Sequence, residues 1–428
     1  MGGFSLLVLI VVLMAGIPVA FAMGAASLLI LAVDRGVTGI PAATLAQRVL
    51  SGLDNFPLLA IPLFLLAGNL MNTGGITTRI FDAANAAVGH IRGGLGHVNV
   101  LASMIFAGMS GSATADAAGL GSVEIKAMTD AGYDRDYSVA ITGASALIGP
   151  IIPPSIPMVL YGILAEVSVG ALFIGGIVPG LLMAASLMIT ASVYARRRGY
   201  PKRPRSSARE ILGAFRRGTL SLMTPAIIIG GISFGVFTAT EAAAFACLYA
   251  MILVCFVYRE VDAAGLWRIL RSTMLDSAVI MLIFGTASLF GYLLVRLRVP
   301  YAMADWVTGL TTNPVLVLLL LNFLFLVIGC FESAAVTITI MTPILVPLIE
   351  KVGIDPLHFG VVMVLNLMIG NLTPPFGMVL FVLQKVGELP FDRIVRALMP
   401  FLIPLALVLL LTIFFPPIVT WLPRLLTR

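Results

Sequence analysis

The sequence predicts an all-α, polytopic membrane protein built as an inverted repeat, with two re-entrant hairpins and two broken helices. Three observations lead to this fold class. Hydrophobic residues occupy 60% of the 428 positions and charged residues only 11%, whereas soluble domains are about a quarter charged. The apolar residues form runs long enough to cross a bilayer. A proline-rich motif occurs once in each half of the chain.

A helix that crosses a bilayer needs roughly 20 predominantly apolar residues. The clearest apolar runs lie at residues 56–71, 172–195, 240–258, 277–295, 315–330 and 401–421. Together with the interrupted segments they predict about 10 to 11 transmembrane helices. The first 22 residues could be a signal peptide, but they lack a basic start and the apolar run continues to Val33. We therefore interpret them as part of the fold.

Charge predicts the orientation. Basic residues dominate positions 196–217, where Glu210 is the only acid. By the positive-inside rule this segment faces the cytoplasm, and binding of anionic lipid or nucleic acid is the minor alternative.

We divide the chain into a first repeat at residues 1–198, a basic cytoplasmic loop at residues 199–219 and a second repeat at residues 220–428.

The evidence for a repeat is a constant offset between the two halves. Residues 144–156 read ASALIGPIIPPSI and residues 365–378 read LNLMIGNLTPPFGM. The offset 374 − 153 = 221 relates Pro153 to Pro374, Gly149 to Gly370 and Ser112 to Ser333. Internal repeats in transporters are often inverted, with the binding site at their interface.

Each half is expected to contain one re-entrant hairpin. Residues 95–131 are interrupted by GMSGSATADAAGLG, which indicates two helical arms with a polar tip at residues 110–116. Irregular backbone at membrane depth is tolerated only where protein or a water-filled cavity surrounds it. The second hairpin is predicted at residues 315–350, with its tip near residues 332–335. The distribution of charged residues predicts that the two hairpins enter the membrane from opposite faces.

Each hairpin is followed by a predicted broken helix, at residues 137–165 and at residues 357–386. Proline cannot continue a helix, so a Pro-Pro step frees backbone carbonyls that need partners. A hard cation such as sodium is one such partner. A simple proline kink is the alternative for a single motif. Two motifs at equivalent positions, each matched with a hairpin tip, favour an ion site.

The first tip supplies hydroxyl groups and one carboxylate. Its glycines could serve only for close packing of the two arms, and Asp116 could simply cap a helix. Ionisable groups inside the membrane are costly, however, and usually functional. The second tip offers Glu332 and Ser333 but lacks a second Ser-Gly-Ser sequence. An ion site in the second half therefore rests partly on symmetry.

Four motifs carry a resemblance to a known family: SGSATAD at the first tip, GPIIPPS, GIDPLHFGVV at residues 353–362, and IGNLTPPFG. Together they resemble the large membrane subunit of the tripartite ATP-independent periplasmic (TRAP) transporters, over essentially the whole chain. Two departures stand out. Asn371 occupies a position where an apolar residue is expected, and the second tip reads Glu-Ser.

The resemblance implies a transporter, not an enzyme, in the bacterial inner membrane. Such a protein would import an organic acid, for example a C4-dicarboxylate or sialic acid, with sodium as the coupling ion and no organic cofactor. The resemblance further implies an elevator-type fold, in which the hairpins and broken helices move against a scaffold. The implied partners are a small membrane subunit and a periplasmic substrate-binding protein, with no nucleic acid.

The resemblance also implies specific sodium ligands, mostly backbone oxygens. The first site would use Ser110, Ser112, Gly149, Ile152 and Pro154. The second site would use Ser333, Gly370, Thr373 and Pro375. The residues expected near the substrate, between the two tips, are Gly111, Thr114, Asp116, Glu332 and Asn371. The sequence does not identify the transported acid.

Three other functions are compatible with parts of the pattern. A stand-alone sodium/carboxylate symporter of the divalent-anion class would share the hairpins but need no binding protein. An intramembrane hydrolase would need a second aspartate beside Asp116, or a serine paired with histidine or lysine, and neither pair is evident. A channel could also be lined by broken helices.

Overall fold

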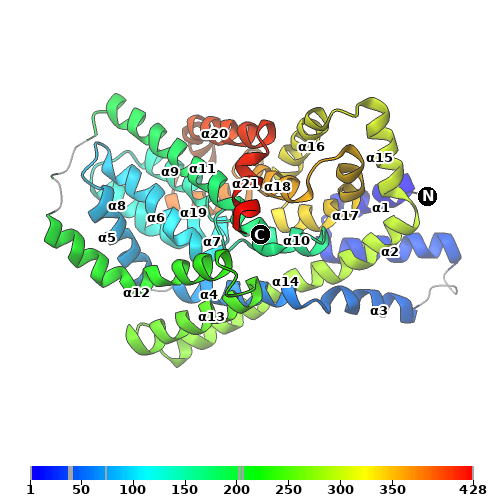
Figure 1. Ribbon diagram of the computed structural model, residues 1–428, viewed down its shortest axis with the longest axis horizontal. Helices are drawn as coiled ribbons and strands as arrows, with labels where there is room; N and C mark the ends of the chain where they lie inside the picture. Colours follow the sequence, from blue (N-terminus) through cyan, green and yellow to red (C-terminus); the bar gives the residue numbers. More distant parts are fainter. Residues whose placement is uncertain (1, 37–41, 73–74, 201–203, 205–206, 427–428) are drawn as a thin grey trace.

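The computed structural model describes residues 2–36, 42–72, 75–200, 204 and 207–426. Every regular element in this part of the chain is a helix (Figure 1). The predicted all-α class is therefore confirmed for these residues.

Two helices, α1 (Gly2–Met14) and α2 (Val19–Arg35), precede the first half. The first half contains α3 (Ala42–Leu53), η2 (Phe56–Leu59), α4 (Ala60–Met71), α5 (Gly75–Val88), α6 (Gly94–Ser110), α7 (Ala113–Ala118), α8 (Leu120–Asp130), α9 (Arg135–Ala146), α10 (Ile156–Leu164) and α11 (Val169–Arg197). Two connecting helices follow, α12 (Ala208–Ser233) and α13 (Ala239–Ile252), the latter continued by the π-helical turn η3 (Leu253–Val257). The second half contains α14 (Ala263–Arg296), α15 (Val299–Leu310), α16 (Pro314–Gly329), α17 (Ala334–Val352), α18 (Pro356–Asn371), α19 (Met378–Gly387), α20 (Phe391–Phe414) and α21 (Pro417–Leu426).

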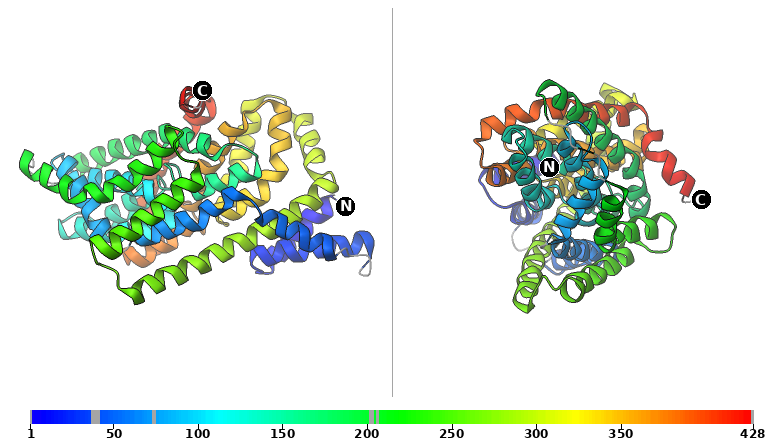
Figure 2. Two further views of the ribbon diagram at one scale, coloured as in Figure 1. Left: turned by 60° about the horizontal axis from the view of Figure 1, so that its bottom comes forward. Right: turned by 90° about the vertical axis from the view of Figure 1, so that its left-hand side faces the viewer.

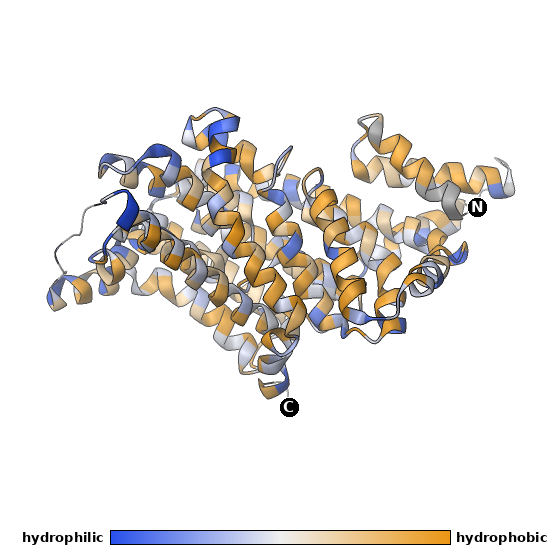
Figure 3. Cartoon of the chain, turned by 90° about the horizontal axis from the view of Figure 1, so that it is seen from above, coloured by the Kyte–Doolittle hydropathy of each residue, from blue (hydrophilic) through white to orange (hydrophobic). Residues whose placement is uncertain are grey.

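The outer surface of these helices is largely apolar, as a lipid environment requires. Ile189 on α11, Trp267 on α14 and Ile403 on α20 are 66%, 64% and 64% exposed. Figure 3 shows hydrophobic residues over most of the helical surface. Contiguous exposed apolar surface of this extent is rare in soluble monomers. The chain is a multi-pass membrane protein.

Fewer helices than predicted are long enough to cross a membrane alone. Among the described residues, five helices meet the length and composition of a span, and up to seven spans result if two bent helix pairs are counted. The sequence predicted about 10 to 11. The difference arises because the tips and breaks divide apolar segments into helices shorter than about 20 residues. α6, α18 and α19 are examples of such short apolar helices.

The same succession of helices occurs in both halves. The starts of α3 and α14 differ by 263 − 42 = 221 residues, those of α7 and α17 by 334 − 113 = 221, and those of α9 and α18 by 356 − 135 = 221. The remaining starts of the hairpins and broken helices agree within one residue, as in 314 − 94 = 220 for α6 and α16. The offset found in two short motifs therefore extends to the helix boundaries.

The two halves interlock at the centre of the molecule. Within each half, the hairpin packs against the first part of the broken helix, α6 against α9 and α16 against α18. The second part of each broken helix packs against the hairpin of the other half, α10 against α17 and α19 against α7. Figure 1 shows α7, α10, α18 and α19 near the middle of the fold. Both tips and both breaks are thereby brought together.

The halves differ at the helix that opens each of them. In the first half this helix is interrupted, and α3 is bent by 62° from the segment that contains η2 and α4. In the second half α14 runs without a break for 34 residues along one side of the molecule (Figure 2). Pro57 and Pro62 lie in this segment of the first half, whereas the positions 221 residues later are Ala278 and Ile283, which continue a helix. Proline is therefore confined to the interrupted member of the pair.

The basic segment contains less loop than expected. α11 continues to Arg197 and α12 already begins at Ala208. Ser207 and Glu210 form a capping box, in which Glu210 N–H donates to Ser207 Oγ at 3.2 Å and Ser207 N–H donates to Glu210 Oε2 at 2.7 Å. The predicted loop at 199–219 therefore becomes helical from Ala208 onward. Its basic residues Lys202, Arg203 and Arg205 lie outside the described residues.

The turn between α8 and α9 is tied to the end of α11. The hydroxyl of Tyr200 donates to Asp134 Oδ2 at 2.7 Å, and Arg198 Nη1 donates to the same oxygen at 2.6 Å. These donors, Tyr200 foremost, lower the pKa of Asp134 below its usual range.

Replacing Asp134 with Asn should lower the melting temperature at neutral pH. Because the pKa of Asp134 is lower in the folded chain, its stabilisation is present above the unfolded-state pKa of about 4 and is lost as pH falls through the folded value. The group is largely exposed, so the effect should not exceed about 1 kcal/mol. Thermal unfolding of the wild type and the variant in detergent, between about pH 7 and pH 3, measures this difference in stability. Asp392→Asn, in an exposed ion pair with Arg396 on α20, is the control. A difference that persists at the lowest pH would contradict the assignment.

Candidate ion and substrate site

The first hairpin turns at two residues between α6 and α7. Gly111 adopts a φ of 62°, in the left-handed region that favours glycine. Ser112 caps α7, because its Oγ accepts from Ala115 N–H at 3.4 Å. Ser110 Oγ donates to Asp116 Oδ1, and Asp116 is only 2% exposed. The other carboxylate oxygen, Oδ2, is buried without a hydrogen-bond partner.

This tip lies directly against the break of the first broken helix. A Cβ atom added to Gly149 would lie 3.2 Å from Cγ of Asp116. A Cβ atom added to Gly111 would lie 2.7 Å from the carbonyl oxygen of Pro154. Both distances are shorter than ordinary contacts, so glycine is needed at both positions for the tip and the break to meet. The structure thus brings Ser110, Asp116, Gly149 and Pro154 together.

The break itself, residues 147–155, is held by a few short-range bonds. Ile152 N–H donates to Ile148 O at 3.0 Å, and Ser155 Oγ donates to Pro150 O at 2.5 Å. The peptide bond between Pro153 and Pro154 is cis. Within the described chain, no hydrogen bond ends on the carbonyl oxygens of Gly149, Ile152 or Pro154. These are three of the five residues predicted for the first ion site. The side chain of Ile152 faces Gly180 of α11.

The second half repeats this arrangement with different chemistry. Ser333 caps α17 by accepting from Val336 N–H at 3.4 Å. Gly370 packs against the backbone of Gly329 in α16, where an added Cβ would lie 2.9 Å from Gly329 Cα. Thr373 Oγ1 donates to Ile369 O at 2.7 Å, so the lone pairs of its hydroxyl oxygen are free to bind a cation.

Asn371 has an unused buried oxygen beside the second break. It is 6% exposed, and its Oδ1 has no hydrogen-bond partner among the described residues. The following peptide bond between Pro374 and Pro375 is cis, as in the first half. Glu332 is half-buried at the tip, with its N–H donating to Ile328 O at 2.9 Å. Each half therefore presents an orphaned oxygen at its break.

A central cavity joins the two tips and the two breaks. It has a volume of about 230 Å³. Its lining includes Gly111, Ser112 and Thr114 from the first tip, Pro150 and Ile156 from the first break, Ser333 and Ala335 from the second tip, and Asn371 and Met378 from the second break. This is the place where the sequence analysis expected the substrate.

A second cavity of about 330 Å³ reaches the other side of the first tip, at Ser110, Asn69 and Asp276. It shares Ser112 and Thr114 with the central cavity. A third, of about 470 Å³, shares Asn69 and continues to Glu260 and Arg268, where η3 ends and α14 begins. The first tip is thus approached from the surface through a series of cavities.

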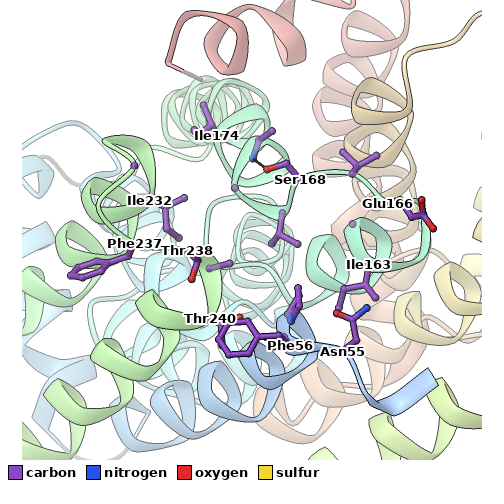
Figure 4. A pocket seen from close by; sticks show the side chains of 18 residues that line it. Asn55, Phe56, Ile163, Glu166, Ser168, Ile174, Ile232, Phe237, Thr238 and Thr240 are labelled. Carbon is purple, nitrogen blue, oxygen red and sulfur yellow. Dashed lines mark hydrogen bonds between the residues drawn. The ribbon is translucent and has the colours of Figure 1, made fainter. Parts of the chain in front are cut away.

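A larger cavity lies elsewhere. It has a volume of about 680 Å³ and is lined by three connections, at residues 55–57, 162–174 and 232–240 (Figure 4). This region is at the end of α11 and α12 opposite the basic segment. It contains none of the predicted site residues, and size alone therefore does not mark the candidate site.

Two residues beside the first tip were not predicted to belong to the site. Neither Asn69 nor Asp276 was assigned to the site from the sequence. The structure places Asp276 well inside α14, which begins at Ala263, and beside the tip. Asn69 Nδ2 on α4 donates to Thr273 Oγ1 on α14 at 2.9 Å. A polar residue inside the apolar run at residues 56–71 was the available signal.

The oxygens gathered here suit a hard cation. Hydroxyl, carbonyl and carboxylate oxygens are the ligands that non-redox cations such as sodium or calcium prefer. Across the described residues, no group of three or more His, Cys, Asp or Glu side chains could hold a metal ion. The residues present fit sodium ions held largely by backbone and hydroxyl oxygens.

Comparison with known proteins assigns the family. Residues 6–418 match the family model described as the tripartite ATP-independent periplasmic transporter, DctM component. The chain belongs to this family. It is 47% identical to the sialic acid TRAP transporter large permease protein SiaM of Vibrio cholerae, over 96% of each chain. It is 40% identical to the C4-dicarboxylate TRAP transporter large permease protein DctM of Pseudomonas aeruginosa, over 89% of each chain.

A solved structure shares the fold of this TRAP family member. The crystal structure of the Alcanivorax borkumensis YdaH transporter superposes with a TM-score of 0.64 over 88% of each chain, at 15% sequence identity. At that identity the likeness concerns the fold alone. It shows that the arrangement described here also occurs in another transporter.

Replacing Gly370 with Ala should destabilise the protein by about 1 to 3 kcal/mol, because the added methyl group meets the backbone of Gly329. Gly230→Ala in α12 is the matched control, since nothing lies within 4 Å of its added Cβ. We expect the control to be neutral or slightly stabilising. Thermal unfolding in detergent compares the two variants. Equal stability of the two would contradict the close approach of α16 and α18.

Proposed function

We propose that this chain imports an organic acid across a bacterial inner membrane, with sodium as the coupling ion. The observation that carries the proposal is the central cavity, where both hairpin tips and both helix breaks meet. Orphaned oxygens of Asp116 and Asn371 border the two breaks. Bound sodium would supply positive charge that neutralises these oxygens and attracts an anionic substrate.

Helix ends around the cavity favour an anion as the substrate. The N-termini of α10, α17 and α19 lie at its wall, through Ile156, Ala334 and Met378. A helix N-terminus carries partial positive charge and unpaired N–H groups, which bind carboxylates. The relatives named for sialic acid and for C4-dicarboxylates are consistent with a carboxylate substrate.

The sodium ligands follow from the residues that border each break. The first ion would be held by Ser110 and Ser112 with the carbonyl oxygens of Gly149, Ile152 and Pro154. The second ion would be held by Ser333, Gly370, Thr373 and Pro375. Half-helix ends that coordinate sodium at such breaks are a recurring feature of secondary transporters.

The packing supports an elevator-type motion of an inverted repeat. Because α10 packs on α17 and α19 packs on α7, the hairpins and broken helices of both halves form one interlocked body. Such a body could move against α4, α13 and α14, of which α4 packs against the other two. The series of cavities from the first tip to the start of α14 would be the exit path on the cytoplasmic side.

The family also supplies expected partners. We infer that the chain works with a small membrane subunit and receives its substrate from a periplasmic binding protein. The large cavity of Figure 4 lies at the end opposite the basic segment, and would therefore face the periplasm.

Uptake into proteoliposomes that contain the chain and its partners tests the sodium sites. Ser112→Ala and Thr373→Ala should each raise the sodium concentration needed for half-maximal uptake by about tenfold, the effect of losing about 1.4 kcal/mol of binding. Ser186→Ala is the control, because Ser186 lies on α11 and its hydroxyl donates only to Met183 O. An unchanged sodium dependence in both variants would refute the assignment.

The same uptake assay distinguishes the proposed function from a stand-alone symporter and from a channel. Uptake by the purified chain without a binding protein would favour a stand-alone sodium/carboxylate symporter of the divalent-anion class. Flux that does not saturate with substrate would indicate a channel.

A further inference from the structure

A buried polar cluster inside the first half is not used by the proposed ion and substrate sites. It lies between α6, α8 and α9 and consists of Asn99, Ser103, Glu124, Thr142 and Ser145. All five are at most 2% exposed, and Glu124 is fully buried. Glu124 Oε2 has no hydrogen-bond partner in the described chain. None of the five lines the central cavity.

The hydrogen bonds of Asn99 set the direction of the network. Its Nδ2 donates to Thr142 Oγ1 at 2.6 Å and also faces the acceptor Met128 Sδ at 3.8 Å. Its Oδ1 therefore faces Ser145, whose Oγ lies 2.7 Å away. An amide oxygen only accepts, so Ser145 must be the donor.

The hydroxyl protons of Ser145 and Ser103 determine how Glu124 can take part in the network. The single hydroxyl proton of Ser145 is already used, so Ser103 must donate across the 2.9 Å between the two hydroxyl oxygens. Ser103 then has no proton left for Glu124 Oε1, which lies 3.5 Å from its Oγ. A hydrogen bond between them exists only if the carboxyl group of Glu124 carries a proton and donates it.

The second half shows that the fold does not need a carboxyl group at this place. The offset of 221 residues relates Glu124 to Leu345, Thr142 to Met363 and Ser145 to Asn366. Leu345 and Met363 are fully buried in α17 and α18, the counterparts of α8 and α9. Asn366 keeps a polar contact, because its Nδ2 donates to Asn322 Oδ1 on α16 at 2.6 Å. The second half therefore has a polar pair between α16 and α18 but an apolar side chain in place of Glu124. A buried polar network costs free energy that packing alone would not require.

The surrounding charges also favour a neutral side chain at Glu124. Asp116 on α7 is the charged group that acts on it, with the same sign. The other charged or titratable groups are turned elsewhere. Arg79 pairs with Glu260, Arg135 with Glu388 and Asp136 with Arg393, and His97 bonds to Ser192. The ring of Tyr137 packs against Tyr200 and Phe401. The exposed groups are Asp82, Lys385 and, on α8 itself, Lys126 and Asp130. An ionised Glu124 would have no counter-charge in a medium without water.

We propose that Glu124 is a proton-binding site in the first hairpin, separate from the two sodium sites. The carboxyl group holds a proton in this conformation and serves as the terminal donor of the network. Its ionisation would leave an unpaired charge between α6, α8 and α9 and loosen the hairpin against the first broken helix.

Thermal unfolding of the full chain in detergent tests the proposal without any transport assay. The folded chain holds one proton that the unfolded chain releases at neutral pH, so its folding equilibrium constant should fall by about tenfold per pH unit from this group. Glu124→Gln keeps a donor but does not titrate, so its stability should exceed that of the wild type increasingly as pH rises. Glu350→Gln, at an exposed position near the end of α17, should follow the wild type.

Each outcome decides the matter. Parallel pH profiles of the wild type and Glu124→Gln would overturn the proposal, and so would a Glu124-dependent stabilisation by sodium salts over choline salts, which would indicate a bound cation instead. Glu124→Leu copies the second half and should also fold. A protein that folds with neither glutamine nor leucine at this position would contradict a neutral carboxyl group.

Uptake gives a second test, which rests on the proposed transport function. Wild-type uptake should decline as pH rises, whereas Glu124→Gln should show a flatter profile with unchanged sodium dependence. If neither protein transports, the transport proposal fails while the unfolding result still decides the role of Glu124.

Discussion

The structure depends on how two interrupted helices satisfy their backbone inside the membrane. A bilayer offers no water to the carbonyl groups that a Pro-Pro step releases, and each unsatisfied group costs several kcal/mol. The fold answers this by placing both breaks at its centre, each against a hairpin tip. Gly111 and Gly370 let backbones approach more closely than any side chain would allow, and Gly149 leaves room for the side chain of Asp116. The first break is thereby buried in protein, and Asn371 at the second break lines the central cavity.

The two halves share an order of helices but differ in chemistry. At the first break a carboxylate, Asp116, lies against Gly149, whereas the equivalent position in the second half is Thr337. The second break offers the amide oxygen of Asn371 instead. The first break thus has a carboxylate against it and the second a neutral amide oxygen, with the carboxyl group of Glu332 at the second tip.

Much of this arrangement is predictable from the sequence, because membrane helices obey simple rules. The apolar composition predicted the all-α class, and the interrupted segment at residues 110–116 coincides with the turn between α6 and α7. What could not be predicted depends on tertiary contacts. Asp276 lies beside the first tip because α14 begins well before it, at Ala263. The role of Glu124 depends on which helices pack against α8. Leu120, Glu124 and Met128 do share one helical face, and this spacing was the available hint.

The central claim is that the two tips and two breaks form one binding region for ions and substrate. The most direct test is a pair of single-particle structures of the full chain, one in sodium salts and one in choline salts. The account predicts sodium-dependent density at both breaks, beside Gly149 and Pro154 and beside Gly370 and Thr373. Identical maps in the two salts, or sodium density only outside these breaks, would contradict it.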